Sequence, residues 1–398
     1  MARDGRRAPR PGTTRRARPR QRRGPRRACA PQPRGVSATR AAASGRARAP
    51  AAVTPSLAAR LVAWQRQHGR HDLPWQGTRD AYRIWLSEVM LQQTQVATVL
   101  VYYERFVGRF PDVGALAAAP LDEVLALWSG LGYYGRARLL HRCAQAVVDE
   151  HGGRFPRRAA TLATLPGIGR STAAAIAVFA YGERAAILDG NVQRVLTRAL
   201  GFGDDLATAA GRRALWAHAE SMLPRRGIRA YTQGLMDLGA TVCLARRPRC
   251  GDCPLAGACV AAAEGRPDAY PVKSRRLQRG RRTSGLLWLV QGDALWLEQR
   301  PAQGVWAGLW SLPQADSAQA WQRAATGWPG QGQALPVIEH ALTHFDWRLE
   351  PLRWTLPARL PAAARRAVEA ALPPGRWVAR DEALALGLPA PVRRLIDG

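Results

Sequence analysis

Apolar residues recur at helical spacing along the first two thirds of the chain, from about residue 55 to 262. Gly and Pro interrupt this pattern at intervals, which divides it into separate helices. The predicted helices span residues 56–68, 80–107, 120–129, 135–151, 159–164, 170–181, 189–200, 207–222 and 228–241. The pattern therefore predicts a mainly α region over 55–265.

The pattern changes in the last part of the chain. The segment SGLLWLVQGDALWLEQR alternates apolar and polar residues around a QGD turn, which is typical of a β-hairpin. HFDWRLEPLRWTL predicts further strands, and two stretches, 317–324 and 361–371, have helical spacing. Residues 266–283 are rich in Arg, Pro and Gly and predict a linker. We therefore expect a separate α+β domain over 284–398.

The strongly positive net charge of the chain indicates a polyanionic binding partner. The chain of 398 residues has a formal net charge of +30, and half of this excess comes from the sixteen Arg and one Asp of the first fifty residues. Residues 1–54 have too few large apolar side chains to form a core and are predicted to be a disordered tail. The tail is either simply solvated or a nonspecific nucleic-acid arm, and the remaining positive charge also suits nucleic acid.

The sequence also bears on where the protein works. It contains no run of about 18 apolar residues, so no membrane span is expected. The Arg-rich start lacks the apolar core of a secretory signal, and it is too poor in Ser to favour an organellar transit peptide. We expect a cytoplasmic, bacterial protein that acts at the nucleoid.

Four of the six cysteines are concentrated in one segment of seventeen residues. Disulfides are disfavoured without an export signal, and structural zinc sites usually have two CxxC-like pairs, whereas this segment has one. Four thiolates on one loop suit an iron–sulfur cluster. We predict a [4Fe–4S] cluster, with zinc as the alternative, held by Cys243, Cys250, Cys253 and Cys259.

The segment LPGIGRSTA has two glycines just before a predicted helix. Gly167 and Gly169 allow a tight turn and leave backbone N–H groups uncovered near the start of that helix. Such a turn is typical of a helix-hairpin-helix, which binds a DNA phosphate without contacting bases. The alternative is an ordinary connection between two helices.

Two carboxylates are candidates for acid chemistry. Glu88 shares a helix face with Ile84 and Leu91, and apolar neighbours raise the pKa of a carboxyl group, as a proton donor requires. Asp189, in AAILDGNVQRVL, could be a second acid or could merely cap the helix that begins near Val192. Either residue alone could equally be a surface carboxylate.

Several motifs together resemble one family. WLSEVMLQQTQV, GLGYYGRAR, LPGIGRSTA, LDGNVQRVL, MDLGATVC and the cysteine loop occur in the order seen in MutY-type adenine DNA glycosylases, and the resemblance covers about residues 56–398. It implies a helix-hairpin-helix glycosylase fold with a [4Fe–4S] loop and a C-terminal MutT/Nudix-like domain. The implied six-helix barrel spans about 80–184, and the iron–sulfur subdomain combines 55–79 with 185–265.

The resemblance implies removal of adenine mispaired with 8-oxoguanine, or guanine, in duplex DNA, by a monomeric enzyme that initiates base excision repair. Glu88 would protonate the adenine ring and assist the attacking water. Asp189 would stabilise the cationic sugar, supported by Asn191. These roles agree with physical chemistry, because neutral adenine is a poor leaving group and the departing base leaves positive charge on the sugar.

The resemblance also implies DNA contacts. The target base must leave the helical stack before it reaches the acid. Gln93 and Tyr133 match residues that insert into the duplex, although Tyr133 could instead pack in the core. Leu73 and Trp75 resemble the wall of the adenine pocket, although LPW could simply start a helix.

Two departures bear on the reaction. Related glycosylases with lyase activity have a nucleophilic lysine in the hairpin, where this chain has Ser171, and the only lysine, Lys273, lies in the predicted linker. The sequence therefore predicts a monofunctional glycosylase. Gln193 stands where some relatives have lysine, which removes a possible phosphate contact but leaves base removal unaffected.

LEQRPAQGVWAGLWSLPQ resembles part of a MutT-like fold but lacks the Glu-rich box that holds magnesium. The domain is therefore expected to bind rather than hydrolyse, and in the family it contacts 8-oxoguanine. Thr343 and His344, in HALTHF, match the contacting loop, with Leu342 where Phe is frequent. An ordinary strand histidine is the alternative for His344.

Three other functions compete with this reading. The missing hairpin lysine and the extra domain disfavour a pyrimidine-lesion glycosylase-lyase. The presence of both Glu88 and Asp189 disfavours a noncatalytic DNA-binding protein, and the missing Glu-rich box disfavours a nucleotide pyrophosphatase.

Overall fold

The computed structural model describes residues 56–274 and 278–398. The tail predicted over 1–54 lies outside the described residues. Within the described ranges, none of the helices is both long and apolar enough to cross a bilayer.

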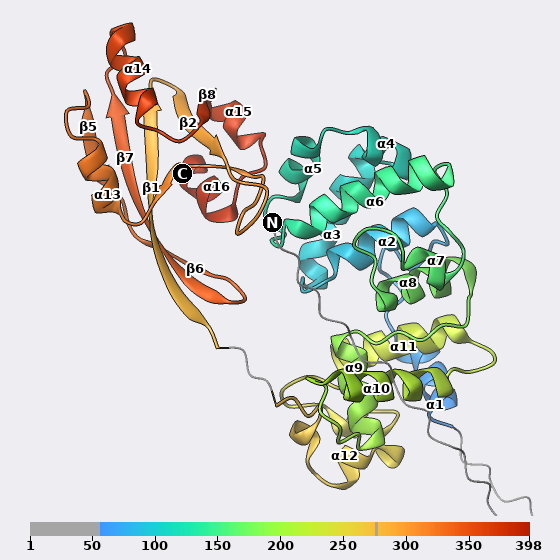
Figure 1. Ribbon diagram of the computed structural model, residues 1–398. Coiled ribbons are helices and arrows are strands. Elements are labelled where there is room, and N and C mark those ends of the chain that lie inside the picture. Colours follow the sequence, from blue (N-terminus) through green and yellow to red (C-terminus); the bar gives the residue numbers. More distant parts are fainter. Residues whose placement is uncertain (1–55, 275–277) are drawn as a thin grey trace, which may run out of the picture. The chain divides into compact units, whose positions relative to one another are not determined.

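The first part of the described chain is helical, as the sequence predicts (Figure 1). Its helices are α1 (Leu57–His68), α2 (Ala81–Met90), α3 (Val96–Arg109), α4 (Val113–Ala118), α5 (Leu121–Trp128), α6 (Gly135–His151), α7 (Ala159–Leu162), α8 (Arg170–Ile176), the π-helix η1 (Ala177–Tyr181), α9 (Gly190–Leu200), α10 (Ala209–Ser221), α11 (Ile228–Thr241), α12 (Val260–Ala263), and the 3-10 turns η2 (Cys250–Asp252), η3 (Ala256–Ala258) and η4 (Pro267–Ala269).

Helices α2 to α8 lie together in Figure 1, and their buried apolar side chains belong to one core. Helix α2 is its central element, since eight of its ten residues are buried. Trp85 of α2 and Trp128 of α5 are fully buried, and the Tyr82 hydroxyl donates to the Phe110 carbonyl at 2.6 Å. A helix buried on nearly all sides is held by packing rather than by its own propensity, so the position of any polar side chain on α2 is fixed.

The single helix predicted over 80–107 is wrong. Helix α2 ends at Met90 and α3 begins at Val96, with Gln93 between them at a φ of 59°. The apolar spacing continues across the break, so the sequence pattern gives no sign of it. The carbonyls at the end of α2 bind a side chain from α6, Arg136, instead of continuing the helix. Helix α4, which is short, was not predicted.

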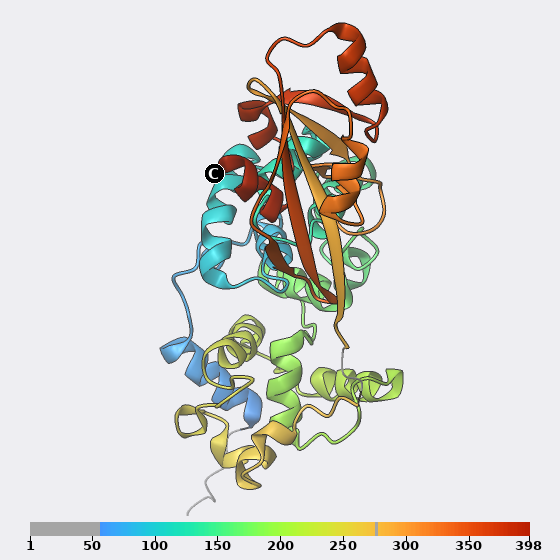
Figure 2. The same ribbon diagram turned by 90° about the vertical axis from the view of Figure 1, so that its left-hand side faces the viewer.

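Helices α1 and α9 to α12 form a second apolar core. Helix α1 precedes the first helical region in sequence but packs on α11, which follows that region, so the chain returns to the second core after passing through the first (Figure 2). The contact is close because Gly234 has no side chain: a Cβ there would lie 3.0 Å from Cγ of Leu61. The chain therefore crosses between the two helical regions twice, once before α2 and once before α9.

The C-terminal part is built on a mixed sheet. Its elements are β1 (Gly280–Gln291), β2 (Ala294–Gln299), β3 (Trp310–Ser311), β4 (Gln314–Ala315), α13 (Ala318–Ala324), β5 (Gln331–Ala334), β6 (Ile338–Ala341), β7 (Phe345–Leu356), α14 (Ala362–Ala370), β8 (Gly375–Ala379), α15 (Arg380–Leu384) and α16 (Ala390–Asp397). β1 begins at Gly280, inside the segment predicted as a linker.

The predicted hairpin is confirmed, because β1 pairs antiparallel with β2 around Gly292 and Asp293. The segment HFDWRLEPLRWTL forms one long strand, β7, which pairs in parallel with β1 along twelve residues (Figure 1). β6 returns antiparallel onto β7. The turn between β6 and β7 therefore lies at one end of the sheet.

Candidate active site

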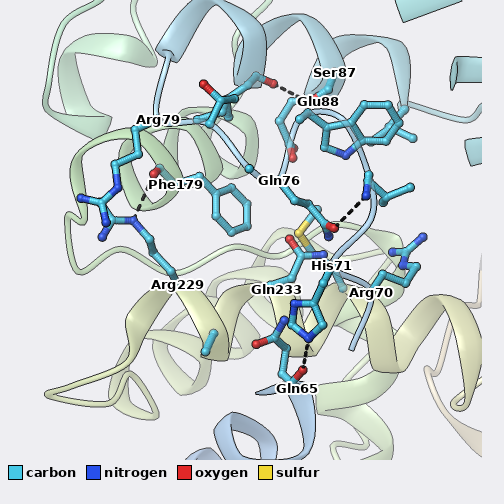
Figure 3. A pocket seen from close by; sticks show the side chains of 18 of the residues that line it. Gln65, Arg70, His71, Gln76, Arg79, Ser87, Glu88, Phe179, Arg229 and Gln233 are labelled. Atoms are coloured by element: carbon cyan, nitrogen blue, oxygen red, sulfur yellow. Dashed lines mark hydrogen bonds between the residues drawn. The ribbon is translucent and has the colours of Figure 1, made fainter. Parts of the chain in front are cut away.

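A cavity of about 400 Å³ lies between the two helical regions. One wall comes from α2, the opposite wall from α1 and α11, and a third from the extended segment that joins α1 to α2. Figure 3 shows the carboxyl of Glu88 pointing into this cavity, with Phe179 and Gln233 on other sides of it. The volume suits a single small aromatic molecule or base.

Glu88 is near the end of α2 and is the acidic side chain that lines the cavity. Burial among apolar neighbours and, as a smaller cause, the charge of Asp189 together raise the pKa of Glu88 to about 8. Ile84 and Leu91 line the cavity beside it, as their helical spacing predicts. Glu88 is therefore protonated at neutral pH and can donate a proton to a group in the cavity.

Asp189 is the N-cap residue of α9. Its Oδ1 accepts hydrogen bonds from the backbone N–H of Asn191 at 2.7 Å and of Val192 at 3.0 Å. Burial raises the pKa of Asp189, while these two amides and Arg194 act in the opposite direction. The charge of Asp189 is in turn one of the causes that raise the pKa of Glu88, so the two carboxyl groups are electrostatically coupled. The capping role and the second-acid role thus belong to the same residue.

Side chains around Asp189 fix its position. The Ser171 Oγ accepts a hydrogen bond from the Leu188 N–H at 2.9 Å, which ties the residue before Asp189 to α8. The Asn191 Oδ1 accepts from Arg194 at 2.8 Å, and Arg194 also donates to the Cys243 carbonyl at 2.8 Å. The helix that begins at Asp189 is therefore tied on one side to the hairpin and on the other to the cysteine loop.

Leu73 and Trp75 line the cavity and are both 8% exposed. They lie in a turn closed by the Gln76 N–H and the Leu73 carbonyl, and α2 begins only at Ala81, so LPW does not start a helix. The Trp75 ring packs edge-on against Tyr103 with centroids 5.2 Å apart. This packing makes a rigid apolar wall.

The sequence did not reveal three polar residues of the cavity, Gln233, Arg79 and Arg229. Arg229 donates to the carbonyls of Phe179 at 3.0 Å and Ala180 at 3.4 Å, and so holds the π-helix η1, whose Phe179 faces the cavity (Figure 3). π-helices are rare in proteins, and those that do occur are often found at functional sites. A helical apolar pattern does not distinguish a π-turn from an α-turn, so this feature had no signal in the sequence.

A buried ion pair anchors the segment that carries Leu73 and Trp75. Asp237 of α11 is 0% exposed and accepts from both the backbone N–H and the Nε of Arg70, at 3.1 and 2.7 Å. Gln233 donates to the same carboxylate at 2.9 Å. A buried carboxylate with three donors fixes the geometry around it. The sequence did contain one sign of this ion pair, because Asp237 in MDLG lies on an apolar helix face, where a carboxylate needs a partner.

The glycine hairpin joins α7 to α8. Gly167 has a φ of 74°, and a Cβ there would lie 2.8 Å from Cβ of Leu139, so only glycine fits without a shift. Gly169 has an ordinary backbone conformation with open space at its Cβ position. It is the N-cap of α8, without a side-chain cap. The turn thus presents an uncapped helix start, which suits an anionic oxygen.

Gln93 and Tyr133 are both exposed and both have left-handed backbones, with φ of 59° and 49°. Tyr133 is 48% exposed, so it does not pack in the core. Its hydroxyl lies 2.8 Å from the Thr343 Oγ1. Neither residue lines the cavity of Glu88.

Thr343 and His344 lie in the turn between β6 and β7, and both are exposed. His344 is therefore not an ordinary strand histidine. Its carbonyl accepts from the Gly280 N–H at 3.0 Å, and the Leu342 N–H donates to the Phe345 carbonyl at 2.9 Å. The turn is held by its backbone, which leaves the side chains of Thr343 and His344 available.

The four cysteines of the loop line one small cavity, together with apolar side chains and Arg198. Arg198 is 3% exposed and its Nη1 lies 3.4 Å from the Cys243 Sγ, as a donor to a thiolate would. In the part of the chain that the structure describes, no group of three or more His, Cys, Asp or Glu is arranged to hold a single metal ion. Four thiols around one cavity, facing a buried guanidinium, fit the predicted iron–sulfur cluster.

Comparison with known families agrees with this arrangement. Residues 86–218 match the HhH-GPD superfamily of base excision DNA repair proteins, residues 243–259 the iron–sulfur binding domain of endonuclease III, and residues 285–398 the NUDIX domain. An adenine DNA glycosylase of Buchnera aphidicola subsp. Acyrthosiphon pisum is 34% identical over 300 residues, which cover 75% of this chain and 86% of the relative. The chain belongs to the adenine DNA glycosylase family.

Further relatives extend the match. The human adenine DNA glycosylase is 34% identical over 389 aligned positions, covering 81% of this chain and 70% of that protein. Among solved structures, a thermostable thymine-DNA glycosylase is 29% identical with a TM-score of 0.47, covering 52% of this chain and 95% of that one.

Family membership confirms the helix-hairpin-helix glycosylase fold with a NUDIX domain. This adenine DNA glycosylase is a hydrolase of base excision repair that acts on DNA. Its cofactor is a [4Fe–4S] cluster bound by the loop of residues 243–259. When bound, the cluster supplies four metal–thiolate bonds that hold a loop with little apolar burial of its own.

Proposed function

We propose that the enzyme hydrolyses the N-glycosidic bond of adenine paired with 8-oxoguanine, or with guanine, in duplex DNA. The observation that supports this is Glu88 in the wall of the cavity, with a pKa raised to about 8 by burial and by the charge of Asp189, which lies nearby but does not itself line the cavity. An extruded adenine enters the cavity between Trp75 and Phe179, and Glu88 donates its proton to a ring nitrogen. The bond from the sugar C1′ to the base breaks, and neutral adenine leaves.

Asp189 stabilises the positive charge that develops on the sugar as the base departs. Two backbone amides hold its Oδ1, so the carboxylate is oriented before the positive charge develops. Water then bonds to C1′, and Glu88, now ionised, accepts the proton of that water. Proton donation and charge stabilisation are thus divided between two carboxyl groups whose surroundings differ.

The remaining contacts serve substrate binding. We propose that Gly167 and Gly169 bind a backbone phosphate, that Gln93 and Tyr133 insert into the duplex, and that Thr343 and His344 contact 8-oxoguanine. The hydrogen bond between Tyr133 and Thr343 supports a link between insertion and recognition of the opposite base. We further propose that the enzyme works as a monomer in the bacterial cytoplasm.

The enzyme is proposed to be monofunctional. The hairpin position that could hold a nucleophilic lysine is Ser171, whose hydroxyl is engaged with the Leu188 N–H. Lys273 is the only lysine of the sequence and does not line the cavity. Without an amine at the sugar, no imine can form and the abasic strand stays intact.

The test uses duplexes that each contain one defined mispair, followed by alkali to cut abasic sites. Cleavage is expected at adenine opposite 8-oxoguanine, with less opposite guanine, and only after alkali. Glu88→Gln is expected to abolish cleavage while binding to the same duplex persists. Strand cutting without alkali, together with borohydride trapping, would disprove monofunctional action, and excision of an oxidised pyrimidine would overturn the proposed substrate.

A further inference from the structure

One side chain in the barrel joins the two loops that contain Gln93 and Tyr133. The four Nη N–H groups of Arg136, in the first turn of α6, are shared among six acceptors, two at the end of α2 and four in the two loops. Nη1 binds the carbonyls of Val89, Met90 and Gln92 at 2.9, 2.9 and 2.6 Å. Nη2 donates to the Thr94 Oγ1 at 3.1 Å and to the carbonyls of Leu131 and Gly132 at 3.2 and 3.3 Å.

Each of the two loops contains a non-glycine residue in an unfavourable backbone conformation. Gln93 and Tyr133 are not glycines, yet both have left-handed backbones, with φ of 59° and 49°. A residue with a Cβ adopts this region only where the surroundings impose it. Three of the six acceptors of Arg136 belong to residues that directly adjoin these two: Gln92 and Thr94 flank Gln93, and Gly132 precedes Tyr133. The guanidinium therefore binds the backbone where the conformation is least favourable.

The chemistry of the guanidinium suits this task. It is planar, with donors in fixed directions, so it can hold two loops at a set distance and angle. Its carbon lies 5.2 Å from the ring centroid of Trp128 and 5.5 Å from that of Tyr133. The carbonyls of Val89 and Met90 are at the C-terminal end of α2, where a cation is also favoured by the helix dipole. A lysine ammonium has three donors and cannot reach six acceptors in two directions.

We propose that Arg136 is a positioning residue that holds Gln93 and Tyr133 in place before DNA arrives, so that both side chains enter the duplex together. This inference rests on the proposed insertion of these two side chains. Arg136 does not touch the target base or the sugar. Its effect is on the extrusion of the adenine, because a preformed pair of inserting side chains loses less conformational freedom on binding.

The test compares Arg136→Lys with Arg142→Lys, an exposed arginine on the same helix. Single-turnover rate constants are measured with enzyme in excess, so that they do not depend on the fraction of protein that is folded. On a fully paired duplex with one adenine opposite 8-oxoguanine, Arg136→Lys is expected to slow excision about 10- to 100-fold. Arg142→Lys is expected to match the wild type.

A second duplex separates positioning from chemistry. Here the pairs on both sides of the target are mismatched, which weakens stacking and makes extrusion easier. The deficit of Arg136→Lys is expected to shrink to about threefold, because extrusion no longer limits the rate. In parallel, 2-aminopurine placed beside a non-hydrolysable 2′-fluoro-adenosine target reports extrusion, and its fluorescence rise is expected to be smaller with Arg136→Lys than with wild type.

Each outcome decides the matter. A wild-type rate for Arg136→Lys on the paired duplex, or an equal deficit on both duplexes, overturns the positioning role while leaving the proposed function intact. Absence of excision by the wild type on every duplex overturns the proposed function itself, and the inference with it.

Discussion

Replacing Glu88 with glutamine is expected to make the protein more stable and inactive at the same time. Burial raises the pKa of Glu88 from 4.5 to about 8. The folded protein therefore keeps a proton that the unfolded chain releases, and the free energy of unfolding of the wild type falls as the pH rises from about 4.5 to 8. Glutamine has no proton to lose, so this loss disappears in the variant.

The size of the effect follows from the shift. Each pKa unit corresponds to about 1.4 kcal/mol, so the full shift gives a ceiling of about 5 kcal/mol above pH 8. The cavity beside Glu88 is open to water, which screens the charge and lowers the expected difference to about 2 kcal/mol. In a domain of this size, that corresponds to about 4–8 °C in Tm.

The assay is thermal unfolding of the wild type and Glu88→Gln at several pH values from 5 to 8.5, with DNA cleavage measured on the same preparations. Glu104→Gln, an exposed residue on α3, is the matched control. The Tm difference between Glu88→Gln and the wild type is expected to grow with pH, and that of the control to stay flat. A difference that does not change with pH would show that Glu88 is already ionised in the folded protein, and the proton-donor argument would fail.

Three further outcomes are expected. Asp189→Asn should abolish base excision and, because the amide is still an acceptable N-cap, lower stability by less than about 1 kcal/mol, as measured by single-turnover assays and urea unfolding. Gly167→Ala should destabilise the protein by about 1–3 kcal/mol and weaken duplex binding, because the added Cβ would collide with Leu139. Filter binding at two salt concentrations measures the affinity for the duplex, and an unchanged affinity would rule out a phosphate contact at the hairpin. Arg198→Met should make the iron–sulfur cluster easier to lose, because the bond to the Cys243 Sγ disappears, seen as faster bleaching of visible absorbance in a chelator.

Much of the helical fold was predictable from local spacing. The helix over 135–151 and the hairpin of β1 and β2 were predicted with nearly the observed limits, because amphipathic periodicity and turn residues are local signals. The break at Gln93 was missed for the opposite reason. The carbonyls at the break bind Arg136, more than forty residues away in sequence, and local apolar spacing contains no information about such a contact.

The sequence by itself determined which chemistry is available: a carboxyl group among apolar neighbours at Glu88, a capping carboxylate at Asp189, a glycine turn and four closely spaced cysteines. Only the tertiary structure decided what these groups do together. The shift in the pKa of Glu88 needs the walls of the cavity and the charge of Asp189, which lies about a hundred residues away along the chain. Electrostatic energy depends on distance and on the exclusion of water, and both are set by packing rather than by the order of residues.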